Sequence, residues 1–153
     1  MGKKIEEIII PKEEAVFWLD KNGCWHNEQG KFQHKKIIDF FHAAIRKDAK
    51  GYYLSQNHGN YREKVYFCCE DGALFVFDVV KEKDIILVLN TKRQIKLKPR
   101  KLYVKDDSLY MRLGKDFIKF TERALMRISE LLQYQNHQYY IKVGERKYKI
   151  PEL

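Results

Sequence analysis

The chain has 153 residues, with 30 Lys and Arg against 21 Asp and Glu, which gives a formal net charge of +9. A chain of this length forms one domain or two small lobes that share a core, and it needs no metal or disulfide to fold. Its longest apolar run, residues 85–89, is far too short to cross a membrane, and the apolar run near Met1 is too short for a secretion signal. Three cysteines, an odd number, give no disulfide framework. We therefore expect a reduced, cytoplasmic protein.

The first predicted elements are two short strands, a helix and a third strand. Residues 15–20 are rich in aromatic and β-branched side chains, as in a strand, and Asn22-Gly23 favours a turn into a returning strand at 24–27. A helix follows Gly30, because apolar residues recur there at a spacing of three to four up to Ile45. Gly51 ends this helical region, and residues 52–55 begin a new strand.

The middle of the chain is predicted to form longer strands. Residues 64–70 and 73–80 flank Asp71-Gly72, a strong hairpin signal, and residues 85–89 and 94–98 follow. The nearly continuous apolar character of 74–77 and 85–89 is typical of strands that are covered on both faces. We expect these strands at the centre of a sheet.

The second half follows the same order as the first. A strand at 102–104, a turn at 105–108 and a strand at 109–111 precede a helix with Thr121 as its N-cap, and a strand at 139–143 follows. Gly114 corresponds to Gly30, Tyr110 to Trp25, and Tyr139-Tyr140 to Tyr52-Tyr53. A repeated supersecondary unit explains this order, although two generic hairpin–helix units could also resemble each other by chance.

The predicted fold class is α+β, with two similar β-hairpin–helix–strand motifs around a mainly antiparallel sheet. The predicted first lobe, residues 1–83, holds one copy of the motif at about 15–56 together with the central hairpin. The predicted second lobe, residues 84–153, holds the other copy at about 102–143.

Positive charge is concentrated in the second lobe. Residues 84–153 carry 16 Lys and Arg against 8 Asp and Glu, and one stretch of this lobe contains seven basic residues and no acid. These seven are Lys92, Arg93, Lys96, Lys98, Arg100, Lys101 and Lys105. Such a stretch can attract the phosphate backbone of nucleic acid, acidic lipid headgroups or an acidic protein. Alternatively, it is the solvent face of edge strands, where lysine prevents edge-to-edge pairing, and the alternation in 94–98 favours this second interpretation.

Catalytic and metal-binding patterns are weak. Cys24, His26 and His34 could supply three zinc ligands, but their spacing matches no structural zinc pattern, so we predict neither a metal nor a cofactor. Cys68 and Cys69 are predicted to be buried and inert within a strand. An enzyme is therefore not the favoured interpretation.

A ligand-binding role is favoured instead. The polar loop 56–62 carries several hydrogen-bond donors and could hold a small anion through Arg62. We predict ligand contacts from His26, Tyr53, Arg62 and Arg123, in a cleft between the two lobes.

Several short motifs resemble a known bacterial family. Asn22-Gly23-Cys24-Trp25, Gly30, a helix with Ile38 and Phe41, and Lys50-Gly51-Tyr52-Tyr53-Leu54 are similar to domain-of-unknown-function family 1285, over about residues 15–132. This resemblance implies an α+β fold with repeated motifs, no established activity, and a role in ligand sensing or signal transduction. The expected partner is an unknown small molecule or protein, and nucleic acid bound by residues 92–105 is the alternative.

Overall fold

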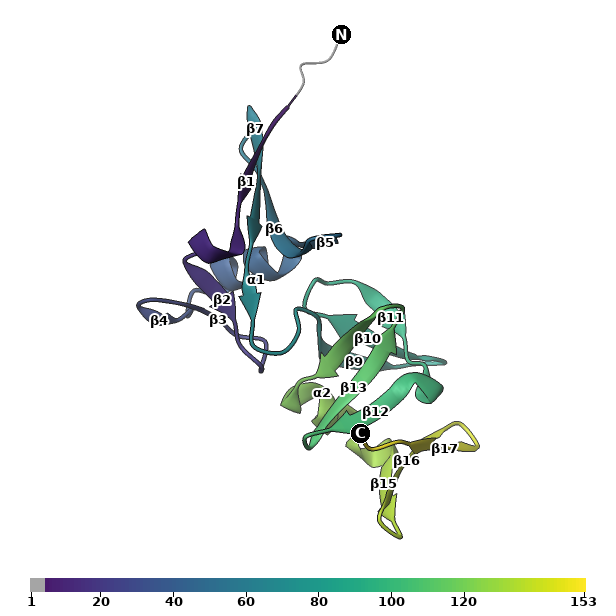
Figure 1. Cartoon of the computed structure of the whole chain (residues 1–153). Helices are drawn as coiled ribbons and strands as arrows, with labels where there is room; N and C mark the ends of the chain where they lie inside the picture. The colour runs from purple at the N-terminus through teal and green to yellow at the C-terminus, as the bar shows by residue number, and fades with distance from the viewer. Residues whose placement is uncertain (1–4) are drawn as a thin grey trace. The chain divides into compact units, whose positions relative to one another are not determined.

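The computed structural model describes residues 5–153 and has an α+β fold (Figure 1). The chain divides into two compact units, Met1–Ala73 and Leu74–Leu153. No helix within the described residues is long and apolar enough to cross a membrane.

The first unit contains eight strands, one α-helix and one 3₁₀-helix among its described residues. They are β1 (Glu6–Ile10), η1 (Lys12–Glu14), β2 (Phe17–Leu19), β3 (Trp25–Asn27), β4 (Gly30–Lys31), α1 (Lys35–Ala43), β5 (Ile45–Asp48), β6 (Gly51–Asn57), β7 (Tyr61–Tyr66) and β8 (Cys68–Cys69). One sheet has the order β1-β7-β6-β5 and the other the order β4-β3-β2-β8. Most neighbours are antiparallel, but β1 runs parallel to β7 and β8 runs parallel to β2.

An aromatic cluster forms the core of the first unit. Trp25 is 1% exposed, and its ring meets those of Phe17, Phe41 and Phe67 edge-on at centroid distances of 5.0–5.8 Å. Edge-to-face contacts of this kind add to the stabilisation that burial alone provides. They join β2, β3, α1 and the residue between β7 and β8, so the core ties both sheets to the helix.

The second unit contains nine strands, one α-helix and two 3₁₀-helices. They are β9 (Phe75–Lys81), β10 (Ile85–Leu89), β11 (Gln94–Lys96), η2 (Pro99–Lys101), β12 (Leu102–Lys105), β13 (Ser108–Leu113), β14 (Asp116–Phe120), α2 (Glu122–Ile128), η3 (Ser129–Leu131), β15 (Leu132–Gln135), β16 (Gln138–Val143) and β17 (Arg146–Ile150). A six-stranded sheet has the order β11-β10-β9-β14-β13-β12, and a three-stranded sheet has the order β15-β16-β17.

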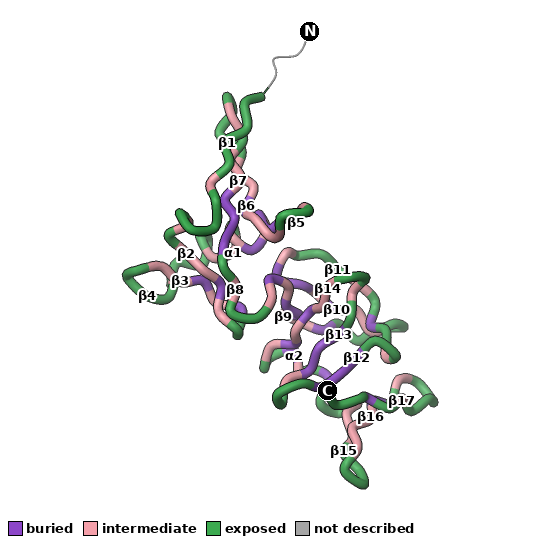
Figure 2. Tube along the Cα trace, in the orientation of Figure 1, coloured by how far each residue is buried: buried purple, intermediate pink, exposed green. Residues whose placement is uncertain are grey.

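Alternating apolar residues build the core of the second unit. Met111, Ile118, Ile128, Ile141 and Ile150 are at most 1% exposed and belong to one cluster of buried residues that joins both sheets to α2. Figure 2 shows buried segments along β12 and β13, whereas β15 and the tip of its hairpin are partly or fully exposed. The three-stranded sheet is therefore covered on one face only.

Several local predictions are confirmed. Thr121 is the N-cap of α2: its hydroxyl oxygen accepts a hydrogen bond from the Ala124 N–H at 3.3 Å, and its O–H donates to the Val76 carbonyl at 2.9 Å. Asp106 and Asp107 form the turn between β12 and β13, with positive φ angles of 50° and 61°. Strands lie where the aromatic and β-branched segments predicted them.

The central hairpin does not form. The strands on either side of Asp71-Gly72 pair with different partners, since β8 joins β2 whereas β9 joins β10 and β14. The unit boundary consequently lies between Ala73 and Leu74, and β9 belongs to the second unit, not to a first lobe ending at residue 83. Within the described part of the chain, four sheets take the place of the expected single sheet.

The first helix is shorter than its pattern suggested. It ends at Ala43, because Ile45 is already a buried residue of β5 that pairs with Leu54. Ile37 and Phe40 belong to this apolar pattern, yet they are 47% and 53% exposed. The spacing of three to four between apolar residues therefore extends beyond the last residue of the helix and does not mark its end.

Candidate functional site

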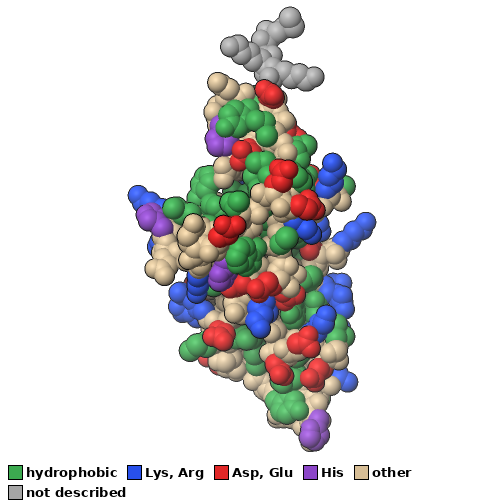
Figure 3. Space-filling model, turned by 60° about the vertical axis from the view of Figure 1, so that its left-hand side comes forward, with side chains coloured by type: hydrophobic (Ala, Val, Ile, Leu, Met, Phe, Trp, Pro, Cys, Tyr) green, Lys and Arg blue, Asp and Glu red, His purple; other side chains and the backbone are tan. Residues whose placement is uncertain are grey.

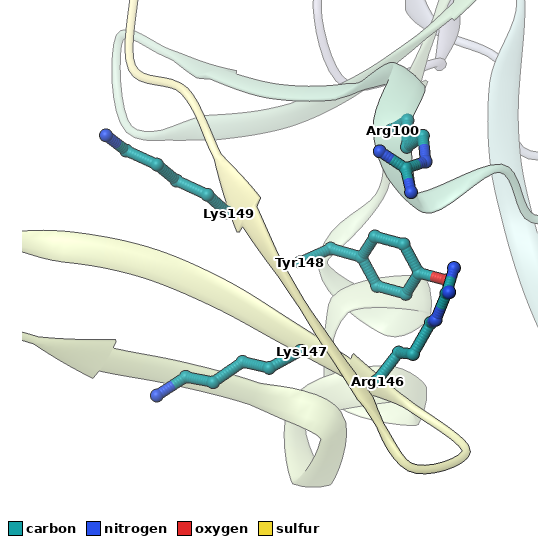
Figure 4. A pocket seen from close by; sticks show the side chains of 5 residues that line it. All are labelled: Arg100, Arg146, Lys147, Tyr148 and Lys149. Atoms are coloured by element: carbon teal, nitrogen blue, oxygen red, sulfur yellow. The ribbon is translucent and has the colours of Figure 1, made fainter.

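An open pocket of about 470 Å³ in the second unit brings four basic side chains and a tyrosine to one place. Arg100 comes from η2, and Arg146, Lys147, Tyr148 and Lys149 come from β17 (Figure 4). Among residues 5–153, no acidic residue lines this pocket.

The alternation of β17 sorts its side chains between two faces. Successive residues of a strand point to opposite sides, so Arg146 and Tyr148 share a face with the buried Ile150, while Lys147 and Lys149 share the other. Figure 4 shows Arg146 and Tyr148 turned toward Arg100, and both lysine side chains directed away. The pocket therefore has two arginines and one tyrosine as its side-chain donors.

Arg100 reaches the pocket from a tight turn. Pro99, with its restricted φ, occupies the start of η2, and the Lys101 N–H donates to the Lys98 carbonyl at 2.9 Å. The guanidinium carbon of Arg100 lies 5.5 Å from the centre of the Tyr148 ring, within the range of a cation–π interaction. Arg146 extends toward the hydroxyl end of the same ring (Figure 4). Both guanidinium groups therefore lie on the Tyr148 side of β17.

Neither arginine is neutralised within residues 5–153, where neither Arg100 nor Arg146 has a carboxylate partner. By contrast, Arg123 and Arg127 of α2 both lie 3.5 Å from the carboxylate of Asp78. A guanidinium group donates two parallel hydrogen bonds to carboxylate or phosphate oxygens, and the Tyr148 hydroxyl can add a third donor. The arrangement is suited to holding an oxyanion.

The predicted ligand residue His26 lies on β3 of the first unit. Its Nε2 is 2.7 Å from the Asp20 carboxylate, and its ring stacks on Trp18 with centroids 5.6 Å apart. Burial alone would raise the pKa of Asp20, but hydrogen bonds from the Cys24 N–H, His26 and the Asn22 N–H hold it below the ordinary value. These contacts fix the orientation of the imidazole.

Tyr53 and Arg62 lie on the β6–β7 hairpin of the first unit. Tyr53 is opposite Tyr66, and Arg62 is opposite Asn57, which places both predicted ligand residues on one face of the hairpin. The rings of Tyr53 and Tyr66 are 5.5 Å apart, and Lys64 Nζ lies 4.7 Å from the centre of the Tyr53 ring. Arg62 is exposed, farther along the hairpin.

The four predicted ligand residues therefore lie on separate elements. His26 belongs to the β4-β3-β2-β8 sheet, Tyr53 and Arg62 to the β1-β7-β6-β5 sheet, and Arg123 to α2 of the second unit, where it pairs with Asp78. The structure brings Tyr53 and Arg62 onto one surface. A shared ligand site for all four residues stays a prediction.

The basic stretch 92–105 is divided by the fold. Lys92 and Arg93 lie in the β10–β11 turn, Lys96 on β11 and Lys105 at the end of β12, and β11 and β12 are the two edges of the six-stranded sheet. Lys96 also pairs with Asp84 at 3.3 Å. On the face drawn in Figure 3, basic and acidic side chains are interspersed and do not form one continuous patch.

Sequence reasoning found one residue of the pocket and missed the others. Arg100 belongs to the basic stretch that the sequence indicated, whereas no predicted site included Arg146 or Tyr148. The alternation in residues 146–150 would have placed these two on a shared face. Nothing local indicates that Arg100 approaches them, because η2 and β17 meet only in the folded chain.

Comparison with known proteins supports the family resemblance at the level of the fold. The sequence matches no family model, and no curated protein is significantly similar to it. The crystal structure of a DUF1285 family protein from Silicibacter pomeroyi matches with a TM-score of 0.63 and 9% identity, over 95% of this chain and 84% of that one. Another from Shewanella baltica matches with a TM-score of 0.51 and 16% identity, over 72% of this chain and 87% of that one. The chain thus has the fold of bacterial DUF1285 family proteins.

Proposed function

We propose that this chain is a cytoplasmic, non-enzymatic regulatory protein that senses a small anionic ligand through Arg100, Arg146 and Tyr148. The observation that carries the proposal is a pair of guanidinium groups that lie near one tyrosine in an open pocket, neither with a carboxylate partner among residues 5–153. Its volume of about 470 Å³ suits a small metabolite that bears a phosphate or carboxylate group. Three free cysteines are in keeping with a reducing compartment.

We also propose that the two units are copies of one motif, in which three strands, a helix and three further strands follow one another. Support comes from the shared pairing order: β2-β3-β4, α1 and β5-β6-β7 in the first unit correspond to β12-β13-β14, α2 and β15-β16-β17 in the second. After these elements, the chain of each unit pairs in parallel with the first strand of the motif. Cys69 lies opposite Leu19 of β2, and Glu152 lies opposite Val104 of β12.

Aromatic pairs support the same correspondence. Trp18 stacks on His26 across β2 and β3 at 5.6 Å, with ring planes 8° apart. Tyr103 stacks on Tyr110 across β12 and β13 at 5.2 Å, with ring planes 6° apart. In this alignment Tyr110 corresponds to His26, not to Trp25 as the sequence spacing suggested.

The residues that line the pocket in the second unit have different counterparts in the first copy of the proposed repeat. Leu54 and Ile141 take equivalent positions, so their partners Val65 and Tyr148 correspond, and Glu63 corresponds to Arg146. A carboxylate therefore stands in the first unit where an arginine stands in the second. This difference supports a division of roles between the two copies.

Isothermal titration with two probes, inorganic phosphate and succinate, tests the ligand proposal and separates phosphate from carboxylate recognition. Arg100→Gln and Arg146→Gln should each lower the affinity for the preferred anion about tenfold or more, because each removes a charge-assisted hydrogen-bond donor. Arg146→Lys should restore only part of the affinity, since lysine keeps the charge and loses the paired donors. At a ligand concentration about a hundredfold above Kd, the unfolding free energy should rise by about 2.7 kcal/mol.

Lys105→Gln is the matched control, because it removes one positive charge from an exposed residue of the same unit outside the pocket. An equal loss of affinity in this variant would mean that only overall charge matters, and the proposed site would be wrong. Absence of binding by both anions to the unaltered protein would contradict the proposal as well.

A further inference from the structure

The outer face of the β15-β16-β17 sheet carries a second cluster of basic side chains, which includes Lys147 and Lys149 at the border of the pocket. We call it the outer face and define it by six of the residues on that side, Gln133, Gln135, Tyr140, Lys142, Lys147 and Lys149. These residues alternate with Ile141, Ile150 and Tyr148, which lie on the opposite face of the sheet. All three lysines are exposed, and none of the six residues is acidic. Figure 4 shows Lys147 and Lys149 leaving β17 on the side away from Arg100.

The register places like charges opposite each other. Lys142 of β16 faces Lys147 of β17, and two like charges at directly opposed positions destabilise a sheet. Among residues 5–153, no carboxylate pairs with either lysine. A bound anion between them would relieve this repulsion.

Protection of a sheet edge does not account for the whole cluster. Lysines on an edge strand deter pairing with other chains, which can explain Lys147 and Lys149, because β17 is an edge of its sheet. Lys142, however, lies on β16, the central strand. A positive charge at this position needs another explanation.

An aromatic ring lies among the lysines. Tyr140 is half-buried and faces Lys149 across the strands, and Lys147 Nζ lies 4.3 Å from the centre of its ring. Lys147 Nζ also donates a hydrogen bond to Gln135 Oε1 at 2.8 Å. The outer face thus combines cations, one flat ring and two amide side chains within a three-stranded sheet.

We infer that the outer face binds single-stranded nucleic acid. Lysines that follow a sheet contact backbone phosphates, and an aromatic ring beside them stacks an unpaired base. Lys147 Nζ would move from the Tyr140 ring to a backbone phosphate, so that an unpaired base can stack on the ring. The amides of Gln133 and Gln135 can hydrogen-bond to base edges. An anionic membrane is a poorer match, since the outer face has no aliphatic side chain to insert into lipid.

Fluorescence anisotropy with a labelled oligouridine of about 12 nucleotides tests this inference, since sites of this kind cover about 4–16 nucleotides. With about three phosphate contacts, the affinity should fall about 20-fold between 50 and 200 mM salt. Lys142→Gln/Lys147→Gln/Lys149→Gln should remove most of this salt dependence. Tyr140→Leu should weaken binding about tenfold and Tyr140→Phe should leave it nearly unchanged, because stacking needs the ring and not the hydroxyl.

A triple variant of equal charge is the control: Lys92→Gln/Arg93→Gln/Lys96→Gln removes three positive charges from the basic stretch in the same unit. If both triple variants weaken binding equally, the attraction is unspecific and the inference fails. It fails also if a duplex of the same length binds as tightly, or if phosphatidylserine vesicles bind and the oligonucleotide does not. These outcomes do not depend on anion binding by Arg146 and Tyr148, the donors that β17 supplies to the pocket, because both lie on the opposite face of the strand.

Discussion

The indole Nε1–H of Trp25 donates a hydrogen bond to Nδ1 of His42 across 3.2 Å, and both side chains are at most 3% exposed. Nδ1 of His42 therefore carries no proton in the folded protein. Burial lowers the pKa of His42 to about 4, although the nearby Asp39 carboxylate opposes this shift. The imidazole belongs to the aromatic core of the first unit.

The stability of the first unit should therefore depend on pH. In the unfolded chain His42 takes up a proton near pH 6.5, whereas in the folded protein it does so only near pH 4. The free energy of unfolding is thus unaffected by this group above about pH 6.5. It falls progressively between about pH 6.5 and pH 4, by about 3 kcal/mol in total, because only the unfolded chain binds the proton in this range. Urea unfolding followed by tryptophan fluorescence measures this, since both tryptophans, Trp18 and Trp25, lie in the first unit. His42→Gln should flatten this part of the profile, and an unchanged profile would contradict the assignment.

Tyr66→Phe should raise the pKa of Asp48. The Tyr66 hydroxyl donates to Asp48 Oδ2 at 2.5 Å and is the main cause that lowers the pKa of this carboxyl group, with Lys64 and the Lys50 N–H as further donors. Asp48 favours the folded state above its unfolded pKa, and this contribution disappears as the pH falls through its lowered folded value. An NMR titration of the Asp48 carboxyl carbon measures the shift. Tyr53→Phe is the control, because it removes a hydroxyl from the neighbouring ring and leaves the Tyr66–Asp48 hydrogen bond intact.

The adjacent cysteines should differ in reactivity. Cys68 is exposed on β8, so the prediction that it is buried was wrong. Cys69 is partly buried, and this burial raises its pKa to about 12. At pH 8 only about one in ten thousand Cys69 side chains is then a thiolate, the form that reacts. Brief treatment with iodoacetamide followed by mass spectrometry should show alkylation of Cys68 well before Cys69, and the reverse order would refute the prediction.

His137→Gly should stabilise the second unit by about 1 kcal/mol. Asn136 and His137 form the two-residue turn between β15 and β16, with positive φ angles of 51° and 60°. A side chain makes this left-handed conformation costly, and glycine adopts it freely. Chemical unfolding followed by circular dichroism measures the gain. Asn136→Gly should give a smaller increase, because asparagine tolerates positive φ better than histidine does.

The sequence alone determined the features that depend on neighbouring residues. Alternating side chains located the strands, two consecutive aspartates indicated the turn at 106–107, and Thr121 indicated the start of α2. Each of these signals arises within a few residues, where backbone geometry and side-chain periodicity act directly. The α+β class follows from them.

Tertiary structure decided which strands pair and which side chains meet. Asp71-Gly72 suits a hairpin locally, yet β8 pairs with β2 and β9 with β10 and β14, because packing of each core outweighs the preference of one turn. Arg100 reaches Tyr148 in the same way, through contacts between segments far apart in the chain. Local patterns indicate which face of a strand is apolar, but they do not indicate which strand or helix will pack against that face.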